Sequence, residues 1–124
     1  MTRKHLLSTV LVAVLLALAG AGHAGPVTKF ENQTQLLPSL SNKTYSLQFK
    51  GGERAVAEAL GNGLSYLGLY VYDAQGNCIA WDDQAPAQTR DDLGVEWYPL
   101  QTGAYMVEIR NAGTRVNNCK IIVR

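Results

Sequence analysis

Residues 64–83 (LSYLGLYVYDAQGNCIAWDD) constrain the fold more than any other part of this chain, because they spell two strands joined by a tight turn. Leucine or valine occupies every second position at 67, 69 and 71, and alternates with tyrosine or glycine. Such period-two alternation is typical of a half-buried strand. Residues 73–76 (DAQG) have aspartate at the first position and glycine at the last, as a type I turn favours. Residues 77–81 then form the second strand, which runs back along the first. The segment predicts an antiparallel hairpin with its aliphatic row facing a core.

Other segments repeat the alternation and are separated by glycine- and asparagine-containing turns. They are residues 45–49, 95–98, 105–110 and 119–123. Residues 54–60 (RAVAEAL) are ambiguous, since alanine and leucine favour helix, but glycines bracket the segment and we interpret it as a strand. About seven short strands without a long amphipathic helix predict an all-β chain, an antiparallel β-sandwich or small barrel. Strand faces this short need two sheets closing on each other.

The first 24 residues have the organisation of a secretory signal peptide. A basic start (Arg3, Lys4) precedes a mainly apolar run, and residues 22–24 (GHA) offer a small-x-small cleavage site. The apolar run is short for a membrane span, and residues 18–21 (LAGA) lack the cysteine of a lipoprotein signal. We therefore expect residues 1–24 to be removed, leaving no membrane anchor, and the protein to be secreted or periplasmic. Residues 25–44 are polar and irregular, with two prolines, and predict an N-terminal arm or a loosely docked first strand.

Removal of the leader changes the chemistry that the chain can carry. Both histidines, His5 and His23, lie in the leader, so histidine-based triads and histidine metal sites are excluded from the processed chain. Its charge is near balance, which does not favour nucleic acid as a partner. Carboxylate-pair catalysis stays open in principle. The acids available for it are Asp82, Asp83, Asp91, Asp92 and Glu96. The simpler interpretation is that these acids lie on solvated loops and strand edges. We therefore expect no enzyme activity and no cofactor.

Cys78 and Cys119 are the only cysteines. An even count in a small exported domain favours pairing, and the bond would stabilise the fold by about 4 kcal/mol in the chain-entropy model. No C-x-x-C spacing suggests a redox role. A structural disulfide is the prediction.

Several blocks, in order, resemble the bacterial pre-peptidase C-terminal domain. They are residues 49–53 (FKGGE), 67–77 (LGLYVYDAQGN), 82–83 (DD), 97–99 (WYP), 102–105 (TGAY) and 109–111 (IRN). The resemblance covers about residues 45–124. It implies a jelly-roll-like β-sandwich of about seven to eight strands, secreted and non-catalytic, in a family whose members bind collagen or other polymers and in some cases calcium. Where many relatives have Asp-Leu-Asp-Leu-Tyr, residues 66–70 are YLGLY, so we predict no metal site from the resemblance. Asp82 and Asp83 leave room for an oxygen-ligand site without indicating one.

The candidate binding residues follow from the hairpin. If the aliphatic row faces the core, Tyr66, Tyr70 and Tyr72 lie on the opposite face, and Trp81 on the returning strand joins them. Aromatic rows of this kind stack on sugars or dock extended proteins. The simpler interpretation is that the tyrosines pack across strands.

Three functions are therefore compared. The first is a secreted binding module that recognises an extracellular protein or polysaccharide. The second is a small inhibitor or protective factor of an extracellular hydrolase. The third is an enzyme that uses paired carboxylates.

Overall fold

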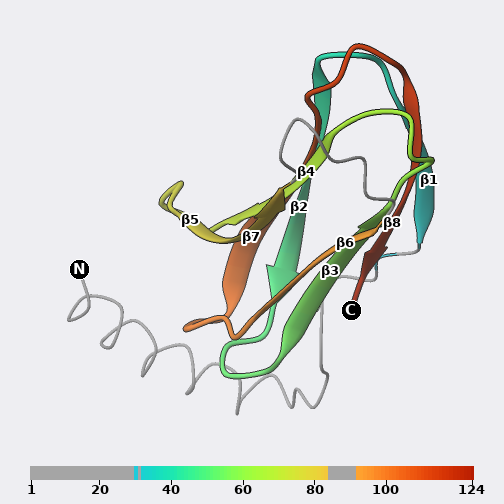
Figure 1. Cartoon of the computed structure of the whole chain (residues 1–124). Helices are drawn as coiled ribbons and strands as arrows, with labels where there is room; N and C mark the ends of the chain where they lie inside the picture. Colours follow the sequence, from blue (N-terminus) through green and yellow to red (C-terminus); the bar gives the residue numbers. More distant parts are fainter. Residues whose placement is uncertain (1–29, 31, 84–91) are drawn as a thin grey trace.

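The computed structural model describes residues 30, 32–83 and 92–124 of the chain. These residues form eight strands in two four-stranded sheets, and every strand pair in them is antiparallel (Figure 1). The first sheet has the order β1-β8-β3-β6 and the second the order β2-β7-β4-β5. The strands are β1 (Gln33–Leu37), β2 (Ser41–Phe49), β3 (Ala55–Leu60), β4 (Leu67–Tyr72), β5 (Cys78–Asp83), β6 (Asp92–Trp97), β7 (Gly103–Asn111) and β8 (Asn117–Val123). Two facing four-stranded sheets connected in this order make a jelly roll, so the predicted all-β antiparallel sandwich is confirmed.

The inward faces follow the period-two patterns of the sequence. Leu69, Val71, Val107 and Ile109 are fully buried between the sheets. An aromatic cluster closes one end of the core, where the ring of Phe49 lies 5.0 Å from that of Trp97 and 5.9 Å from that of Tyr105. The edge-to-face geometry of these pairs is the arrangement that aromatic quadrupoles prefer.

Strand β3 settles the ambiguous segment at residues 54–60. It lies inside the first sheet, paired with β8 on one side and β6 on the other. Ala55, Ala57 and Ala59 face the core and are at most 1% exposed. Here the pairing of both strand edges and the burial of an alternate row outweigh the helix propensity of alanine.

Residues 25–44, expected to form an N-terminal arm or a loosely docked first strand, contain the whole of β1 and the start of β2. Strand β1 pairs with β8 over its whole length, and β2 begins at Ser41. The sequence of β1 is mostly polar because the strand lies at the edge of its sheet and buries only one side chain, that of Leu37. Residues 25–29 and 31, like the whole predicted signal peptide, lie outside the described residues.

The turn between β4 and β5 has the predicted chemistry. The Gly76 N–H donates to the Asp73 carbonyl at 3.0 Å, and Gly76 has a φ of 85°. The Asp73 carboxylate accepts hydrogen bonds from the backbone N–H groups of Gln75 and Asn77, both at 2.9 Å. In the described part of the chain, no helix is long and apolar enough to cross a bilayer.

The predicted disulfide is wrong: both cysteines are free thiols. Cys119 is fully buried on β8, whereas Cys78 is exposed at the start of β5, the edge strand of the other sheet. Burial raises the pKa of the Cys119 thiol to about 11. An even number of cysteines says nothing about strand order, and the jelly-roll connection places β5 and β8 in different sheets.

Candidate functional site

The outer face of the second sheet carries most of the candidate residues. In β4, Gly68, Tyr70 and Tyr72 lie on this face, because Leu67, Leu69 and Val71 point into the core. On the neighbouring strand β5, Trp81 lies directly opposite Tyr70. Directly opposed residues of an antiparallel pair project to the same side. The structure therefore places Tyr70, Tyr72 and Trp81 on one surface.

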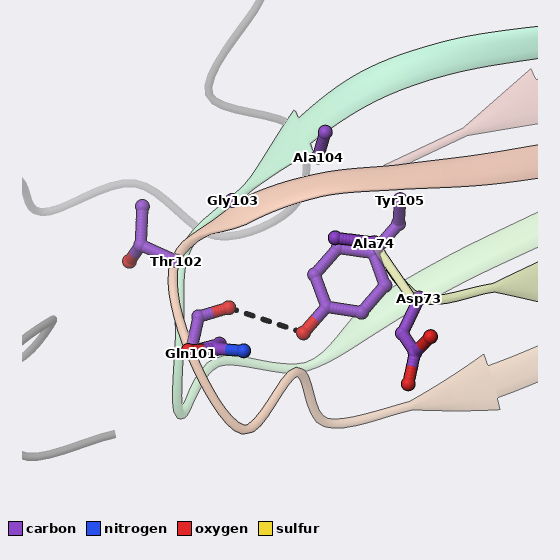
Figure 2. A pocket seen from close by; sticks show the side chains of 7 residues that line it. All are labelled: Asp73, Ala74, Gln101, Thr102, Gly103, Ala104 and Tyr105. Carbon is purple, nitrogen blue, oxygen red and sulfur yellow. Dashed lines mark hydrogen bonds between the residues drawn. The ribbon is translucent and has the colours of Figure 1, made fainter. Parts of the chain in front are cut away.

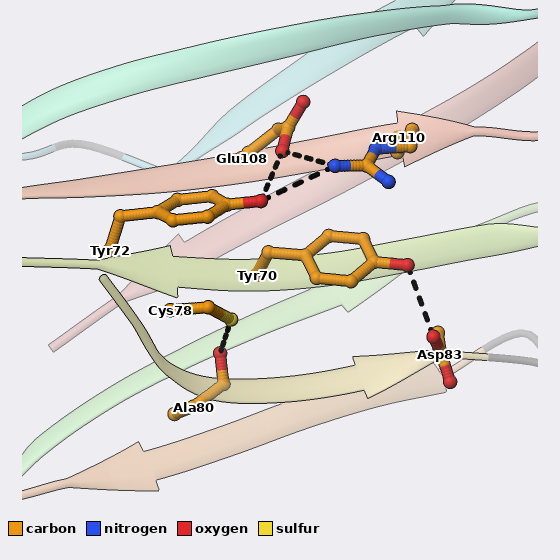
Figure 3. Close-up of polar contacts among 7 residues, drawn as sticks. All are labelled: Tyr70, Tyr72, Cys78, Ala80, Asp83, Glu108 and Arg110. Carbon is orange, nitrogen blue, oxygen red and sulfur yellow. Dashed lines mark hydrogen bonds and ion pairs between the residues drawn. The ribbon is translucent and has the colours of Figure 1, made fainter. Parts of the chain in front are cut away.

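Tyr70 lies down over its own strand instead of projecting from it. A Cβ atom at Gly68 would be 2.6 Å from Cε1 of Tyr70, so the ring occupies the space that the glycine leaves open. The Tyr70 hydroxyl donates to Oδ2 of Asp83 at 3.1 Å (Figure 3). The guanidinium of Arg110, opposite Gly68 on β7, lies 4.2 Å from the ring centroid. Such a cation–π contact fixes the ring further.

Tyr72 belongs to the same polar network. Its hydroxyl donates to Oε1 of Glu108 at 3.1 Å and accepts from Nη2 of Arg110 at 3.3 Å. Arg110 and Glu108 also form an ion pair at 2.9 Å (Figure 3). Burial, followed by the hydrogen bonds to Asp83 and Glu108, raises the pKa values of Tyr70 and Tyr72. The hydrogen bond to Glu108 raises the pKa of Arg110. At neutral pH the two phenols are uncharged, and they lie beside one cation, Arg110, that is paired with the Glu108 carboxylate.

Trp81 and Tyr66 stand differently from these two tyrosines. Trp81 is 61% exposed, which leaves most of its indole open to solvent beside Tyr70. Tyr66 precedes β4 and is half-buried, and its backbone carbonyl accepts a hydrogen bond from the Ala112 N–H. Within the described residues its hydroxyl takes no part in the network. Of the four aromatic residues predicted to form a row, Tyr70 and Tyr72 thus belong to a polar network, and Trp81 is an exposed indole next to it.

Arg110, Glu108 and Asp83 are the members of this surface that sequence reasoning did not single out as binding residues. Glu108 and Arg110 alternate with buried Val107 and Ile109, so their outward direction could be predicted. Their position beside β4 could not, because it depends on the pairing of β7 with β4, which are far apart in the chain.

The acids considered for catalysis do not form a pair on this face. Asp82 and Asp83 are adjacent on β5 and project to opposite sides, since Asp83 accepts from Tyr70 while Oδ2 of Asp82 accepts from the Gly94 N–H at 3.1 Å. Glu96 is paired with Arg54. Asp91 lies outside the described residues. Among the residues that the structure covers, no group of three or more potential metal-binding side chains occurs.

A small pocket lies at the end of the sandwich near the β4–β5 turn, with a volume of about 230 Å³ (Figure 2). Three of its polar side chains, those of Asp73, Thr102 and Tyr105, already have partners within the protein. The Tyr105 hydroxyl donates to the Gln101 carbonyl at 3.1 Å, and the Thr102 hydroxyl accepts from the Gly51 N–H at 2.8 Å. The Asp73 carboxylate is bound within its turn. The outer face of the second sheet, with its exposed indole, is therefore the stronger candidate site.

Comparison with known proteins identifies the fold. No protein-family model matches the chain, and no curated protein matches it by sequence. The solved pre-peptidase C-terminal domain of collagenase from Bacillus anthracis is similar in structure, with a TM-score of 0.59 at 13% identity, covering 84% of this chain and 97% of that one. PirA is similar with a TM-score of 0.53 at 11% identity, covering 79% of this chain and 99% of PirA. The periplasmic lysozyme inhibitor PliG of Aeromonas hydrophila is similar with a TM-score of 0.50 at 12% identity, covering 76% of this chain and 85% of PliG. The resemblance to the pre-peptidase C-terminal domain is confirmed as a resemblance of fold.

Proposed function

We propose that this protein is an exported, non-catalytic binding module that recognises an extracellular protein or polysaccharide through the outer face of its second sheet. The observation that carries the proposal is Trp81, 61% exposed and directly opposite Tyr70. An indole that is mostly exposed to water on an edge strand contributes little to folding, whereas it offers a flat apolar platform to a ligand. The signal-peptide pattern of residues 1–24 supports export to the periplasm or the medium.

The network beside Trp81 suits recognition because it is already ordered. Arg110 is held by Glu108 and Tyr72 and packs on the Tyr70 ring, so its remaining N–H groups point from a fixed position. A binding site whose side chains are immobilised beforehand loses less conformational entropy when the ligand arrives. Sugar hydroxyls and peptide carbonyls are both acceptors that a fixed guanidinium can bind.

Trp81→Ala is the sharpest test, because Tyr70 and Tyr72 are tied into the sheet and their replacement would disturb more than the surface. Immobilised exported protein would be incubated with insoluble cell-wall polysaccharides and with extracellular protein extracts, and captured material identified by mass spectrometry. For the ligand so found, we expect Trp81→Ala to weaken binding by about 30-fold, the size of a hot-spot loss of about 2 kcal/mol. Its unfolding free energy should change by no more than about 0.5 kcal/mol.

Tyr98 supplies the matched control. It is also 61% exposed, and it follows β6 of the first sheet. Tyr98→Ala should therefore leave binding unchanged. Equal binding by the wild type and Trp81→Ala would show that this face is not the recognition surface.

A small secreted inhibitor or protective factor of an extracellular hydrolase is the alternative. It is favoured by the β4–β5 hairpin, which extends away from the sandwich and is exposed from Ala74 to Ile79 (Figure 1). A protruding hairpin is a shape that can enter an enzyme cleft, and PliG, an inhibitor of g-type lysozyme, shares the fold. Inhibition of a secreted hydrolase that is lost when residues 74–77 are exchanged, but kept in Trp81→Ala, would favour this alternative.

A further inference from the structure

A straight row of side chains crosses the outer face of the second sheet from one edge to the other. Trp81 of β5 lies opposite Tyr70 of β4, which in turn lies opposite Glu108 of β7. Glu108 lies opposite Thr44 of β2. Directly opposed residues of antiparallel strands project to the same side, so all four lie on the outer face. Because β5 and β2 are the edge strands of this sheet, the row spans its full width.

The width of the row fits a short stretch of a sugar chain. Neighbouring strands lie about 4.8 Å apart, so the three intervals from β5 to β2 span about 14 Å. One strand interval is close to the length of one unit in a β-linked sugar chain. A glycan that lies across the strands would therefore place about four units on the face, one over each strand.

The two central strands present a flat surface. The Tyr70 ring lies over Gly68, and the Arg110 guanidinium covers that ring at 4.2 Å from its centroid. The Tyr72 hydroxyl reaches Glu108 and Arg110 on β7, so its ring also lies along the sheet (Figure 3). These side chains are bonded to one another and keep their positions, which leaves a level surface over which a chain can lie.

The apolar groups open to solvent on this face are few and separated. Trp81 is mostly exposed opposite Tyr70, and Met106 is partly exposed opposite Tyr72. Ile79, also partly exposed, falls at the bulge between β4 and β5. An isolated indole is large enough to stack on one sugar ring. The core of a protein interface is a larger apolar patch from which charged residues are depleted.

The far edge of the face is polar and uncharged. Four exposed side chains alternate along β2 with those that point inward, namely Asn42, Thr44, Ser46 and Gln48. Their hydroxyl and amide groups both donate and accept hydrogen bonds, as sugar hydroxyls do. The face therefore offers an apolar plane at one edge and hydrogen-bonding partners at the other. This combination matches the apolar ring faces and the hydroxyl groups of a sugar chain.

The charges on and around the face balance. Within the described residues, one cation and two carboxylates project from it, namely Arg110, Glu108 and Asp83. Lys43 of β2 lies opposite a buried residue of β7 and so projects to the other side. The described loops that adjoin the strands carry three cations and two carboxylates, namely Lys50, Arg54, Arg115, Glu53 and Asp73. The sum over the face and these loops is zero, so no excess charge attracts a charged polymer.

We propose that the outer face of the second sheet binds a neutral, β-linked polysaccharide that lies across its four strands, with one sugar stacked on Trp81 and another hydrogen-bonded to Thr44. This inference rests on the proposed function, because it names the ligand class of the same face. A β-linked chain is an extended ribbon, and that shape suits a flat sheet.

A protein ligand fits this face less well. An extended peptide adds to a sheet through its backbone at an edge strand, whereas β4 and β7 are paired on both sides. Tyrosine and arginine are common at the hot spots of protein interfaces, but Tyr70, Tyr72 and Arg110 are engaged with one another here. The exposed polar side chains of β2 add no apolar area to a protein contact.

The test uses the exported protein, its N-terminus verified by mass spectrometry, in calorimetric titration with β-1,4-linked oligosaccharides of glucose, N-acetylglucosamine, xylose or mannose. For at least one sugar type, we expect affinity to rise up to about four units and then to level off, because further units would lie beyond β2. Trp81→Ala should weaken binding of the four-unit sugar by about 30-fold. Thr44→Val should weaken it by about fivefold, the effect of losing one hydrogen bond. Valine keeps the shape and the strand propensity of threonine, so Thr44→Val should melt as the wild type does.

Thr34→Val is the matched control, because Thr34 is exposed on β1, an edge strand of the first sheet. It should bind as the wild type does. Equal affinity for two-unit and six-unit sugars, or unchanged binding by Thr44→Val, would show that the ligand does not cross the sheet and would overturn the proposal. Tighter binding of an acidic oligosaccharide, such as oligogalacturonate, would overturn it as well.

Failure of this inference can be told apart from failure of the proposed function. If no oligosaccharide binds, but a protein is captured from an extracellular extract and Trp81→Ala abolishes that capture, the polysaccharide is wrong and the face is still a recognition surface. If Trp81→Ala changes the binding of neither sugars nor proteins, both the inference and the proposed function are wrong.

Discussion

Replacement of Asn111 tests how much one buried amide, which joins the loops that follow β1 and β7, contributes to the stability of the fold. Asn111 is fully buried, and its Oδ1 accepts from the Gly113 N–H at 3.0 Å, while Nδ2 contacts the carbonyls of Leu37, Pro38 and Arg115. An amide has two hydrogens, so we count two donated bonds and one accepted bond. At about 1 kcal/mol each, Asn111→Ala should destabilise the fold by about 3 kcal/mol. That corresponds to a fall in Tm of ~12–24 °C for a domain of this size.

Urea unfolding followed by tryptophan fluorescence measures this difference, with the m-value checked for constancy. Asn118→Ala is the control, since Asn118 is an exposed asparagine on the following strand, β8, and its effect should stay within about 0.5 kcal/mol. Asn111→Asp should be more damaging than Asn111→Ala at neutral pH, because a buried carboxylate would face the same carbonyl oxygens. An Asn111→Ala protein within about 1 kcal/mol of wild type would refute the reasoning.

Two further predictions concern the thiols and one close backbone contact. Ellman's reagent should titrate one thiol, Cys78, in the native protein and a second, Cys119, only after unfolding; a protein that shows no thiol under denaturing conditions would contradict the free cysteines. Gly51→Ala should destabilise the fold by about 1–3 kcal/mol, since its Cβ would lie 2.8 Å from the backbone N of Thr102. Gly103→Ala, which meets nothing within 4 Å, should change the unfolding free energy by no more than about 0.5 kcal/mol, and equal effects in thermal denaturation of the two variants would contradict the contact.

Sequence reasoning located most of the strands and their inward faces, because period-two alternation is a local property. It also placed Tyr70, Tyr72 and Trp81 on one surface, since the hairpin that joins them has a short turn of recognisable chemistry. It underestimated β1, whose polar residues suit an exposed edge strand and carry little hydrophobic signal. For the same reason the start of β2 at Ser41 was not expected from the sequence.

The network around those residues was beyond local inference. Arg110 and Glu108 reach Tyr72 only because β7 pairs with β4, and the residues in contact are 36 and 38 positions apart in the chain. The flat position of the Tyr70 ring over Gly68 is likewise a product of packing. A tyrosine that the sequence predicts to be an exposed stacking surface can thus be immobilised by contacts with its neighbours.

The sequence by itself determined that the chain makes short strands, which side of each strand is apolar and where the hairpin between β4 and β5 turns. Those properties depend on residues a few positions apart. Only the tertiary structure decided which strands became neighbours, and with them the free cysteines, the fixed Arg110 and the contact of Asn111 with the loop after β1. Alternating patterns make every strand a possible partner of every other, and strand order is chosen by the packing of two whole sheets.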